Sequence, residues 1–103
     1  MDEFSIDELD ELIAEATVDA YGDDEQRTGL YTMIEEHLVV PFTTEILGVR
    51  VTVQRVDQND SGEIVAICRR DGTHQAIAIL DLPLPDPAPD GSQWIEAYRR
   101  WAV

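Results

Sequence analysis

Residues 38–56 read LVVPFTTEILGVRVTVQRV, and the spacing of the apolar residues changes within this stretch. Up to Leu38 the apolar residues recur at steps of three and four, which is typical of a helix. Pro41 ends that pattern. From Val49 onward apolar and polar residues alternate, which predicts a half-buried strand. The chain therefore changes from helix to sheet near Pro41, and this order indicates an α+β fold.

Two helices are expected before Pro41. In the first, Ser5 and Glu8 have the spacing of a capping box. Apolar residues recur at helical steps from there, and Gly22 has the character of a residue just past a helix end. The first helix is therefore expected to end near Tyr21.

The second helix is expected to begin with Asp23 or Asp24 as its N-cap and to run through Leu38. Gly29 lies inside it, where glycine costs about 1 kcal/mol relative to alanine. A glycine kept inside a helix at that cost indicates close backbone packing or a break at this point.

A small antiparallel sheet should follow, because the turns are short. The clearest turn is Asp71-Gly72, a strong signal for a two-residue hairpin. The sheet either stays open or curls into an SH3-like barrel. About three strands are expected, with a fourth between Pro41 and Ile46; they are Ile46 or Leu47 to Val56, Ile64–Arg69 and Gln75–Leu80.

Beyond the sheet, a proline-rich stretch is expected to act as an extended spacer. Ser92 then caps a last helix with Trp94, Tyr98 and Trp101 on one face. We interpret this aromatic stripe as core packing rather than a binding platform. The whole is expected to be one domain, with an acidic helical part (1–40), a β-meander (41–80), a connector (81–91) and a C-terminal helix (92–103).

The composition limits the classes of function. The 103 residues are 44% hydrophobic, with 22 Asp and Glu against seven Arg and no Lys, for a net charge of −15. This balance argues against binding nucleic acid or anionic membranes, since both need basic residues. The single cysteine, Cys68, excludes an internal disulfide and a cysteine-based zinc site. No apolar run approaches membrane-spanning length and the first residues are acidic, so we expect a cytoplasmic protein.

The acidic residues gather in the first third. Residues 1–36 hold thirteen acidic residues and a single arginine, so −12 of the net charge of −15 lies there. A halophilic host would explain the missing lysines but predicts acidic residues on every face. A solvated helix face is the other ordinary explanation of such a run.

The acidic residues around the predicted helix–helix corner form the main candidate site. Clustered carboxylates repel one another unless a cation neutralises them, and Ca²⁺ takes six to eight oxygen ligands of this kind. Mg²⁺ is the alternative ion, with a stricter octahedral geometry. The candidate metal ligands are Asp19, Asp23, Asp24, Glu25, Glu35 and Glu36.

A second, weaker ion site is considered at Asp57, Asn59 and Asp60. Their stretch partly follows the spacing of an EF-hand loop, but its twelfth position is Cys68 rather than glutamate. The flanking residues alternate like strands. We therefore favour a plain hairpin turn, with weak ion binding as the alternative.

We found no motif of a known enzyme class. The two histidines, His37 and His74, have no partner at metal-ligand spacing, and His37 is interpreted as a helix C-terminal residue. The sequence has no phosphate-binding loop and no nucleophile–base pair at a known spacing. We therefore expect a protein that is not an enzyme.

Several segments between Thr17 and Phe42 resemble the small calcium-binding protein family known from cyanobacteria. The shared features are Val18-Asp19-Ala20-Tyr21 with the acidic stretch after it, Gly29, Glu35-Glu36 before Leu38, and Pro41-Phe42. The resemblance implies Ca²⁺ binding on an acidic surface without EF-hands, as a buffer or sensor. It implies Asp19, Glu25, Glu35 and Glu36 as site residues, to which the charge argument adds Asp23 and Asp24. The sequence departs from the family at residues 30–33, where the family has several aromatic residues.

The resulting hypothesis is an acidic calcium-binding protein with an affinity in the micromolar to millimolar range. The rival hypothesis uses the same acidic residues as a face that docks a basic protein partner or mimics the charge of nucleic acid. An ion site needs carboxylates that converge on one point, whereas a docking face spreads them. The sequence leaves the oligomeric state open.

Overall fold

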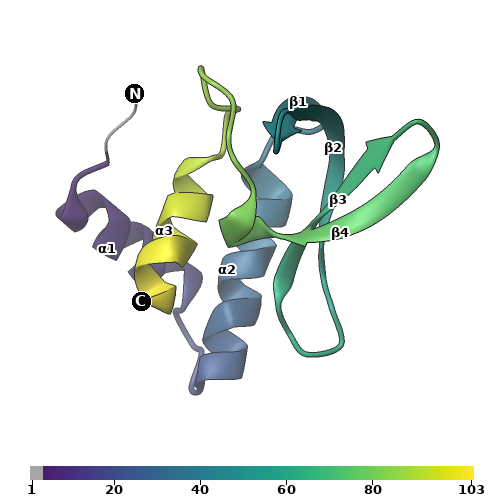
Figure 1. The fold of residues 1–103 in the computed structure, drawn as a ribbon. Helices are drawn as coiled ribbons and strands as arrows, with labels where there is room; N and C mark the ends of the chain where they lie inside the picture. Colours follow the sequence, from purple (N-terminus) through teal and green to yellow (C-terminus); the bar gives the residue numbers. More distant parts are fainter. Residues whose placement is uncertain (1–3) are drawn as a thin grey trace.

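The computed structural model describes residues 4–103, which form helices on one side of an antiparallel sheet (Figure 1). This is the predicted α+β class, with two helices before the sheet and one after it. In chain order the elements are α1 (Ile6–Ala16), α2 (Asp23–His37), β1 (Phe42–Ile46), β2 (Val49–Gln58), β3 (Ile64–Arg70), β4 (Thr73–Ala78), the 3₁₀ helix η1 (Ile79–Asp81) and α3 (Gln93–Ala102).

The sheet has the strand order β1-β2-β3-β4, with every neighbouring pair antiparallel. Its two edges, β1 and β4, do not pair with each other, so the open sheet is observed and not the SH3-like barrel. The fourth strand expected after Pro41 is β1. It ends at a turn in which Leu47 and Gly48 both have positive φ, 52° and 78°. The expected strand start at Ile46 or Leu47 is therefore wrong, because residues 47 and 48 form the turn and β2 begins at Val49. Leucine seldom adopts a positive φ, so the sequence does not indicate this turn.

The first helix ends earlier than expected. It begins with the predicted capping box of Ser5 and Glu8 but stops at Ala16 rather than near Tyr21. At Thr17 both the backbone N–H and Oγ1 donate to the Ile13 carbonyl, at 2.9 and 2.7 Å. A competing hydroxyl of this kind favours a helix end.

The predicted N-cap of α2 is also wrong. Gly22, and not Asp23 or Asp24, occupies that position, in an extended conformation. No side chain caps α2; Glu25 Oε1 instead accepts a hydrogen bond from the N–H of Tyr21, the residue before the N-cap, at 2.8 Å. The interpretation of Gly22 as the residue after the first helix fails for the same reason.

Two further boundaries differ from the expectation. The hairpin turn places Thr73 opposite Arg70, so β4 spans Thr73–Ala78 rather than Gln75–Leu80. Ser92 does precede α3, but it has helical dihedral angles and its side chain makes no capping hydrogen bond. The first turn of α3 therefore starts without the predicted side-chain cap.

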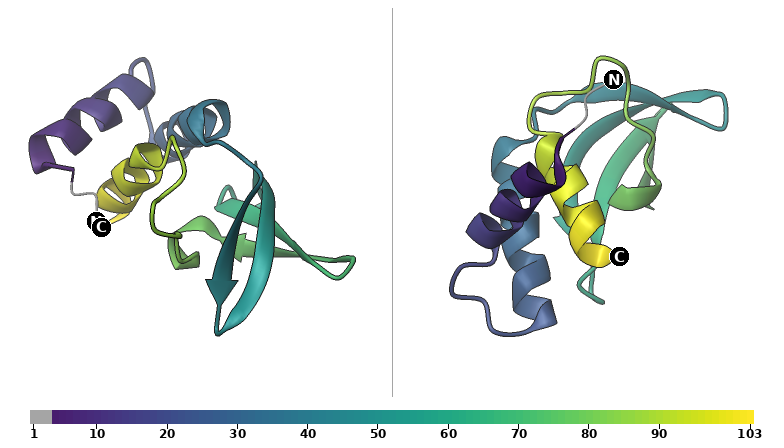
Figure 2. Two further views of the ribbon diagram at one scale, coloured as in Figure 1. Left: turned by 90° about the horizontal axis from the view of Figure 1, so that it is seen from above. Right: turned by 90° about the vertical axis from the view of Figure 1, so that its left-hand side faces the viewer.

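The core lies between the sheet and the helices α2 and α3, and α1 covers the outer side of these two helices (Figure 2). Trp94 and Tyr98 are buried in this core, which fits the interpretation of the aromatic stripe as packing. Trp101 lies at its border, where its Nε1–H donates to Gln26 Oε1 at 2.9 Å. Across residues 4–103, the helices are too short or too polar to cross a membrane.

Gly29 explains how α1 and α2 approach each other. A Cβ atom at this position would overlap the carbonyl oxygen of Ala16, at the end of α1. The close packing expected from a glycine inside the second helix is thus confirmed. The contact holds the corner between the two helices in place.

An ion pair joins α1 to α3. Arg100 Nε donates to Asp10 Oδ1 at 2.7 Å, and Arg100 Nη2 donates to Asp10 Oδ2 at 3.4 Å. The hydrogen bond from Arg100, together with its charge, lowers the pKa of the Asp10 carboxyl group. Both groups are largely exposed to solvent, so salt will screen their attraction.

This pair predicts a pH dependence. Because the pKa of Asp10 is lower in the folded state, the pair stabilises the fold above the unfolded-state pKa of about 3.9, and this contribution is lost as the pH falls through the folded-state pKa. We expect Asp10→Asn to lower the free energy of unfolding at pH 7 and to change it far less at acid pH. Urea unfolding at both pH values measures this, and an equal loss at both would contradict it.

Candidate metal centre

A hollow at the corner between α1 and α2 gathers three of the predicted carboxylates. It has a volume of about 440 Å³, and Asp19, Asp24 and Glu25 line it. Thr28 and Thr32, on successive turns of α2, line it as well. We call this the corner hollow. All of its polar side chains offer oxygen atoms that can act as metal ligands.

Local structure places each of the three carboxylates. Asp19 has a φ of 66° and lies in the turn after α1. Aspartate tolerates this left-handed conformation better than most residues. Asp24 and Glu25 lie in the first turn of α2, where the helix dipole favours negative charge. Arg27 approaches Asp24 at 3.7 Å between Nη1 and Oδ1, and the Asp24 side chain is fully exposed.

The other three predicted ligands lie elsewhere. Asp23 is exposed in the first turn of α2 but does not line the corner hollow. Glu35 and Glu36 lie near the other end of α2, about three helical turns from Glu25. The six residues therefore do not surround one point.

Glu35 belongs to a second, smaller hollow of about 260 Å³, which it shares with Tyr31, Arg55 and Asp57. The Tyr31 hydroxyl donates to Glu35 Oε2 at 3.2 Å. Partial burial raises the pKa of Tyr31, and the Glu35 carboxylate raises it further. Asp57, considered above for a second ion site, thus lines the hollow of Glu35 and does not line the corner hollow.

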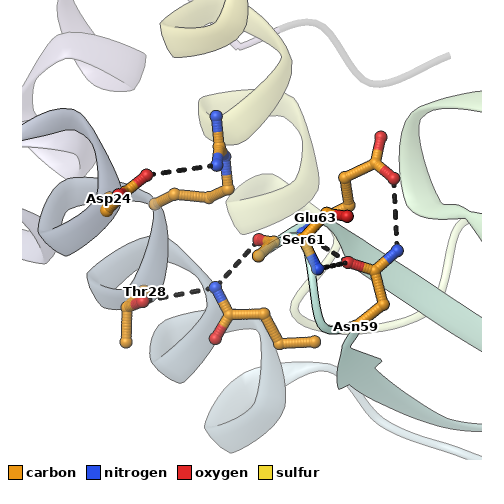
Figure 3. A network of polar contacts seen from close by, with 8 residues as sticks. Asp24, Thr28, Asn59, Ser61 and Glu63 are labelled. Carbon is orange, nitrogen blue, oxygen red and sulfur yellow. Dashed lines mark hydrogen bonds and ion pairs between the residues drawn. The ribbon is translucent and has the colours of Figure 1, made fainter.

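Two of the three residues considered for a second ion site, Asp57 and Asn59, have side-chain oxygens that accept local hydrogen bonds, and Figure 3 shows those of Asn59. Asp60 is exposed in the turn. The Gln58 N–H donates to Asp57 Oδ1 at 2.8 Å, and Arg55 Nη1 lies 3.1 Å from Asp57 Oδ2. These two interactions, the backbone one first, lower the pKa of Asp57. Asn59 Oδ1 accepts from the N–H groups of Ser61 and Glu63. The geometry is that of a hairpin turn, as favoured above.

The same loop contacts α2 beside the corner hollow. Gln58 Nε2 donates to Thr28 Oγ1 at 3.2 Å and to the Gly62 carbonyl at 2.9 Å (Figure 3). Neither Thr28 nor Gln58 stood out in the sequence, because their contact depends on how the sheet packs against α2. One hydrogen bond thus joins the end of β2 to a residue that lines the corner hollow.

Asn59 offers a test of that loop. Asn59→Ala removes two hydrogen bonds to backbone N–H groups, each worth about 1 kcal/mol, and we expect a loss of about 1–2 kcal/mol in the free energy of unfolding. Calcium affinity should stay unchanged, because Asn59 lies outside the corner hollow. Urea unfolding and a calcium titration of the variant measure the two effects; a loss of calcium binding with unchanged stability would contradict the assignment.

Two further side chains considered in the sequence, His37 and Cys68, pack within the fold. His37 stacks on Trp94, with 5.6 Å between the ring centroids. Cys68 is buried in the sheet, and its burial raises the pKa of the thiol. Within residues 4–103, no three His, Cys, Asp or Glu side chains are grouped closely enough to hold a metal ion. The carboxylates of the corner hollow thus border it without converging.

A comparison with known protein families adds independent information. A family model described as calcium binding matches residues 10–102, almost the whole chain. The chain belongs to this calcium-binding family. The resemblance to the cyanobacterial-type proteins is thereby confirmed and extends well beyond Phe42. Comparisons with curated proteins and with solved structures found no match.

Proposed function

We propose that this protein binds Ca²⁺ in the corner hollow, with Asp19, Asp24 and Glu25 as carboxylate ligands. The observation that carries the proposal is that three carboxylates line one hollow in a chain of the calcium-binding family. All three are exposed, so they can turn inward without breaking core contacts. Glu25 keeps Oε2 for the ion while its Oε1 accepts from Tyr21.

The oxygen chemistry of the hollow fits calcium. Ca²⁺ accepts carboxylate, carbonyl and water oxygens in a flexible shell, whereas Mg²⁺ demands a near-ideal octahedron and gives up its water reluctantly. Three carboxylates on flexible stems suit the larger ion better. Because the site is open and not preformed, we expect an affinity between micromolar and millimolar. We propose a buffer or sensor without catalytic activity.

Calorimetric titration with CaCl₂ tests this assignment. In the double variant Asp19→Asn/Glu25→Gln the heat of binding should vanish. Asparagine tolerates the positive φ of position 19 and glutamine can still accept from Tyr21, so the fold should be kept. The matched control Glu35→Gln/Glu36→Gln removes the same charge at the other end of α2 and should bind calcium as the wild type does.

If both double variants lose calcium equally, the corner hollow is not the site. If only the Glu35/Glu36 variant loses it, the ligands lie at the C-terminal end of α2. Titration with MgCl₂ in parallel separates the two ions, and we expect weaker binding of Mg²⁺.

A second candidate is an acidic face that docks a basic protein. The observation in its favour is that exposed acidic residues extend along α1 and both ends of α2, while none of the described carboxylates converge on a metal-sized site. With a synthetic arginine-rich peptide as the probe, docking of this kind should weaken by similar factors in both double variants and fall with added salt. Ion binding at the corner hollow predicts unequal effects of the two variants.

A further inference from the structure

The sheet carries an apolar trough far from the acidic helices. It has a volume of about 630 Å³, within the usual range for ligand pockets. Its lining residues come from the β1–β2 and β3–β4 hairpins, whose turns point away from the helices in the left view of Figure 2. We define the apolar trough by its apolar lining residues, Ile46, Leu47, Val49, Val51, Cys68 and Ile77.

A free strand edge borders this trough. In β4 the residues Thr73, Gln75 and Ile77 line the trough. The two-residue turn makes Thr73 and Arg70 a hydrogen-bonded pair, so alternation directs the backbone N–H and C=O groups of His74 and Ala76 to the outer edge. Both residues are exposed.

The β4 edge lacks the usual protection against pairing with another strand. Residues 73–78 read THQAIA, with no charged residue and no proline. The opposite edge, β1, carries Glu45, and the proline-rich connector lies against it, since Thr44 Oγ1 donates to the Pro83 carbonyl. Natural proteins cover or charge an edge strand in this way to prevent pairing. The β1 edge is therefore protected against pairing with another strand, whereas the β4 edge is not.

The mouth of the trough carries charged residues of both signs, the two arginines Arg69 and Arg70 and also Asp71. Both arginines are exposed, but only Arg70 pairs with Thr73 and so shares the face of the sheet that lines the trough, because successive strand residues point to opposite faces. The only ion pair of Arg70 among the described residues is with Asp71, at 3.7 Å, and both side chains are mainly in solvent. An exposed pair at this distance is weak. Arg70 can therefore accept a carboxylate from a bound molecule.

We propose that the β4 edge and the apolar trough bind an extended peptide segment of a partner protein. The segment has apolar residues at alternate positions and an acidic residue near Arg70. It would pair with His74 and Ala76 through its backbone and turn its apolar side chains over Gln75 and Ile77 into the trough. Strand addition of this kind gains affinity from the backbone and specificity from pockets for alternate side chains.

The distance between an added strand and Arg70 allows this ion pair. An added strand lies about 4.8 Å beyond β4, so Arg70 on β3 is about 10 Å away. Long arginine and glutamate side chains on the same face can meet over that distance. A second copy of this chain is the weaker occupant, because two copies with a net charge of −15 each repel one another.

The test uses a synthetic peptide of alternating valine and threonine with one terminal glutamate. In ¹H–¹⁵N NMR titrations we expect the largest amide shifts at His74, Ala76 and Ile77, and slower hydrogen exchange at His74 and Ala76. The same peptide with N-methyl groups on alternate residues of its pairing edge should bind at least tenfold more weakly, and no change in the protein is needed for that comparison.

Two variants with matched controls complete the test. Ala76→Pro should abolish binding while Thr43→Pro, on the opposite edge, leaves it unchanged. Arg70→Gln should weaken binding about fivefold and Arg50→Gln should not. The proposal is overturned if the peptide does not bind at millimolar concentration, if N-methylation has no effect, or if the protein alone dimerises through β4, since a second copy would then be the occupant.

Discussion

Gly29→Ala should destabilise this protein by about 2 kcal/mol, although alanine is the better helix former. Helix propensity alone predicts a gain of about 1 kcal/mol. The new Cβ would, however, overlap the carbonyl oxygen of Ala16, a backbone atom that cannot rotate away, and this overlap lowers the stability of the fold. Overpacking of this kind costs about 3 kcal/mol at its upper range, so the clash outweighs the propensity.

Thermal and urea unfolding measure the effect, and for a domain of this size the melting temperature should fall by about 10 °C. Gly22→Ala is the matched control, because a Cβ there meets nothing within 4 Å and φ is −139°. Losing glycine at this N-cap should cost less than about 1 kcal/mol. A Gly29→Ala variant as stable as the wild type would mean that α1 and α2 do not pack as described.

Gly29 also lines the corner hollow, so this variant bears on function. Pushing the end of α1 away from α2 should move Asp19 relative to Glu25. We therefore expect weaker calcium binding as well as lower stability, whereas Asn59→Ala lowers stability alone. The comparison separates a general loss of stability from a change at the corner.

The second large effect is expected from calcium itself. At a free concentration of 100 times its dissociation constant, Ca²⁺ should raise the free energy of unfolding by about 2.7 kcal/mol, equivalent to about 15 °C in melting temperature. Part of this reflects relief of repulsion, since residues 1–36 carry −12. Monovalent salt screens that repulsion without binding, so KCl of equal ionic strength should stabilise less.

The double variant Asp19→Asn/Glu25→Gln should lose the stabilisation by calcium but not the stability of the calcium-free protein. Without calcium it should be at least as stable as the wild type, because two mutually repelling charges are gone. With calcium it should gain no more than it gains from KCl. Differential scanning calorimetry in both salts measures this. A full calcium response in the variant would show that the stabilising ion binds elsewhere.

Parts of this fold could be predicted because their signals are local. The capping box of Ser5 and Glu8 and the turn at Asp71-Gly72 each depend on neighbouring residues, and both were predicted correctly. The turn at Leu47-Gly48 was missed, because leucine with a positive φ is held there by strand pairing and not by its own preference. The end of α1 was placed too late, since Thr17 is compatible with a helix until its hydroxyl competes for the Ile13 carbonyl.

For the candidate site, too, local features could be predicted from the sequence and tertiary contacts could not. Charge density along the chain indicated the corner between the first two helices as a candidate site, but such density carries no information on whether the carboxylates converge. Glu35 and Glu36 are close to Glu25 in sequence and yet about three helical turns from it along α2. The hydroxyls of Thr28 and Thr32 join the corner hollow only because Gly29 lets α1 approach α2. Which residues line the hollow depends on tertiary packing, and no local sequence pattern indicates it.

The most direct test of the corner hollow as the calcium site is a ¹H–¹⁵N NMR titration of the protein with CaCl₂, read residue by residue. The amides of Asp19, Asp24 and Glu25 should shift most and saturate together, with one dissociation constant, while those of Glu35 and Glu36 change little. Largest shifts at Glu35 and Asp57, or small uniform shifts over all exposed acidic residues, would contradict the assignment.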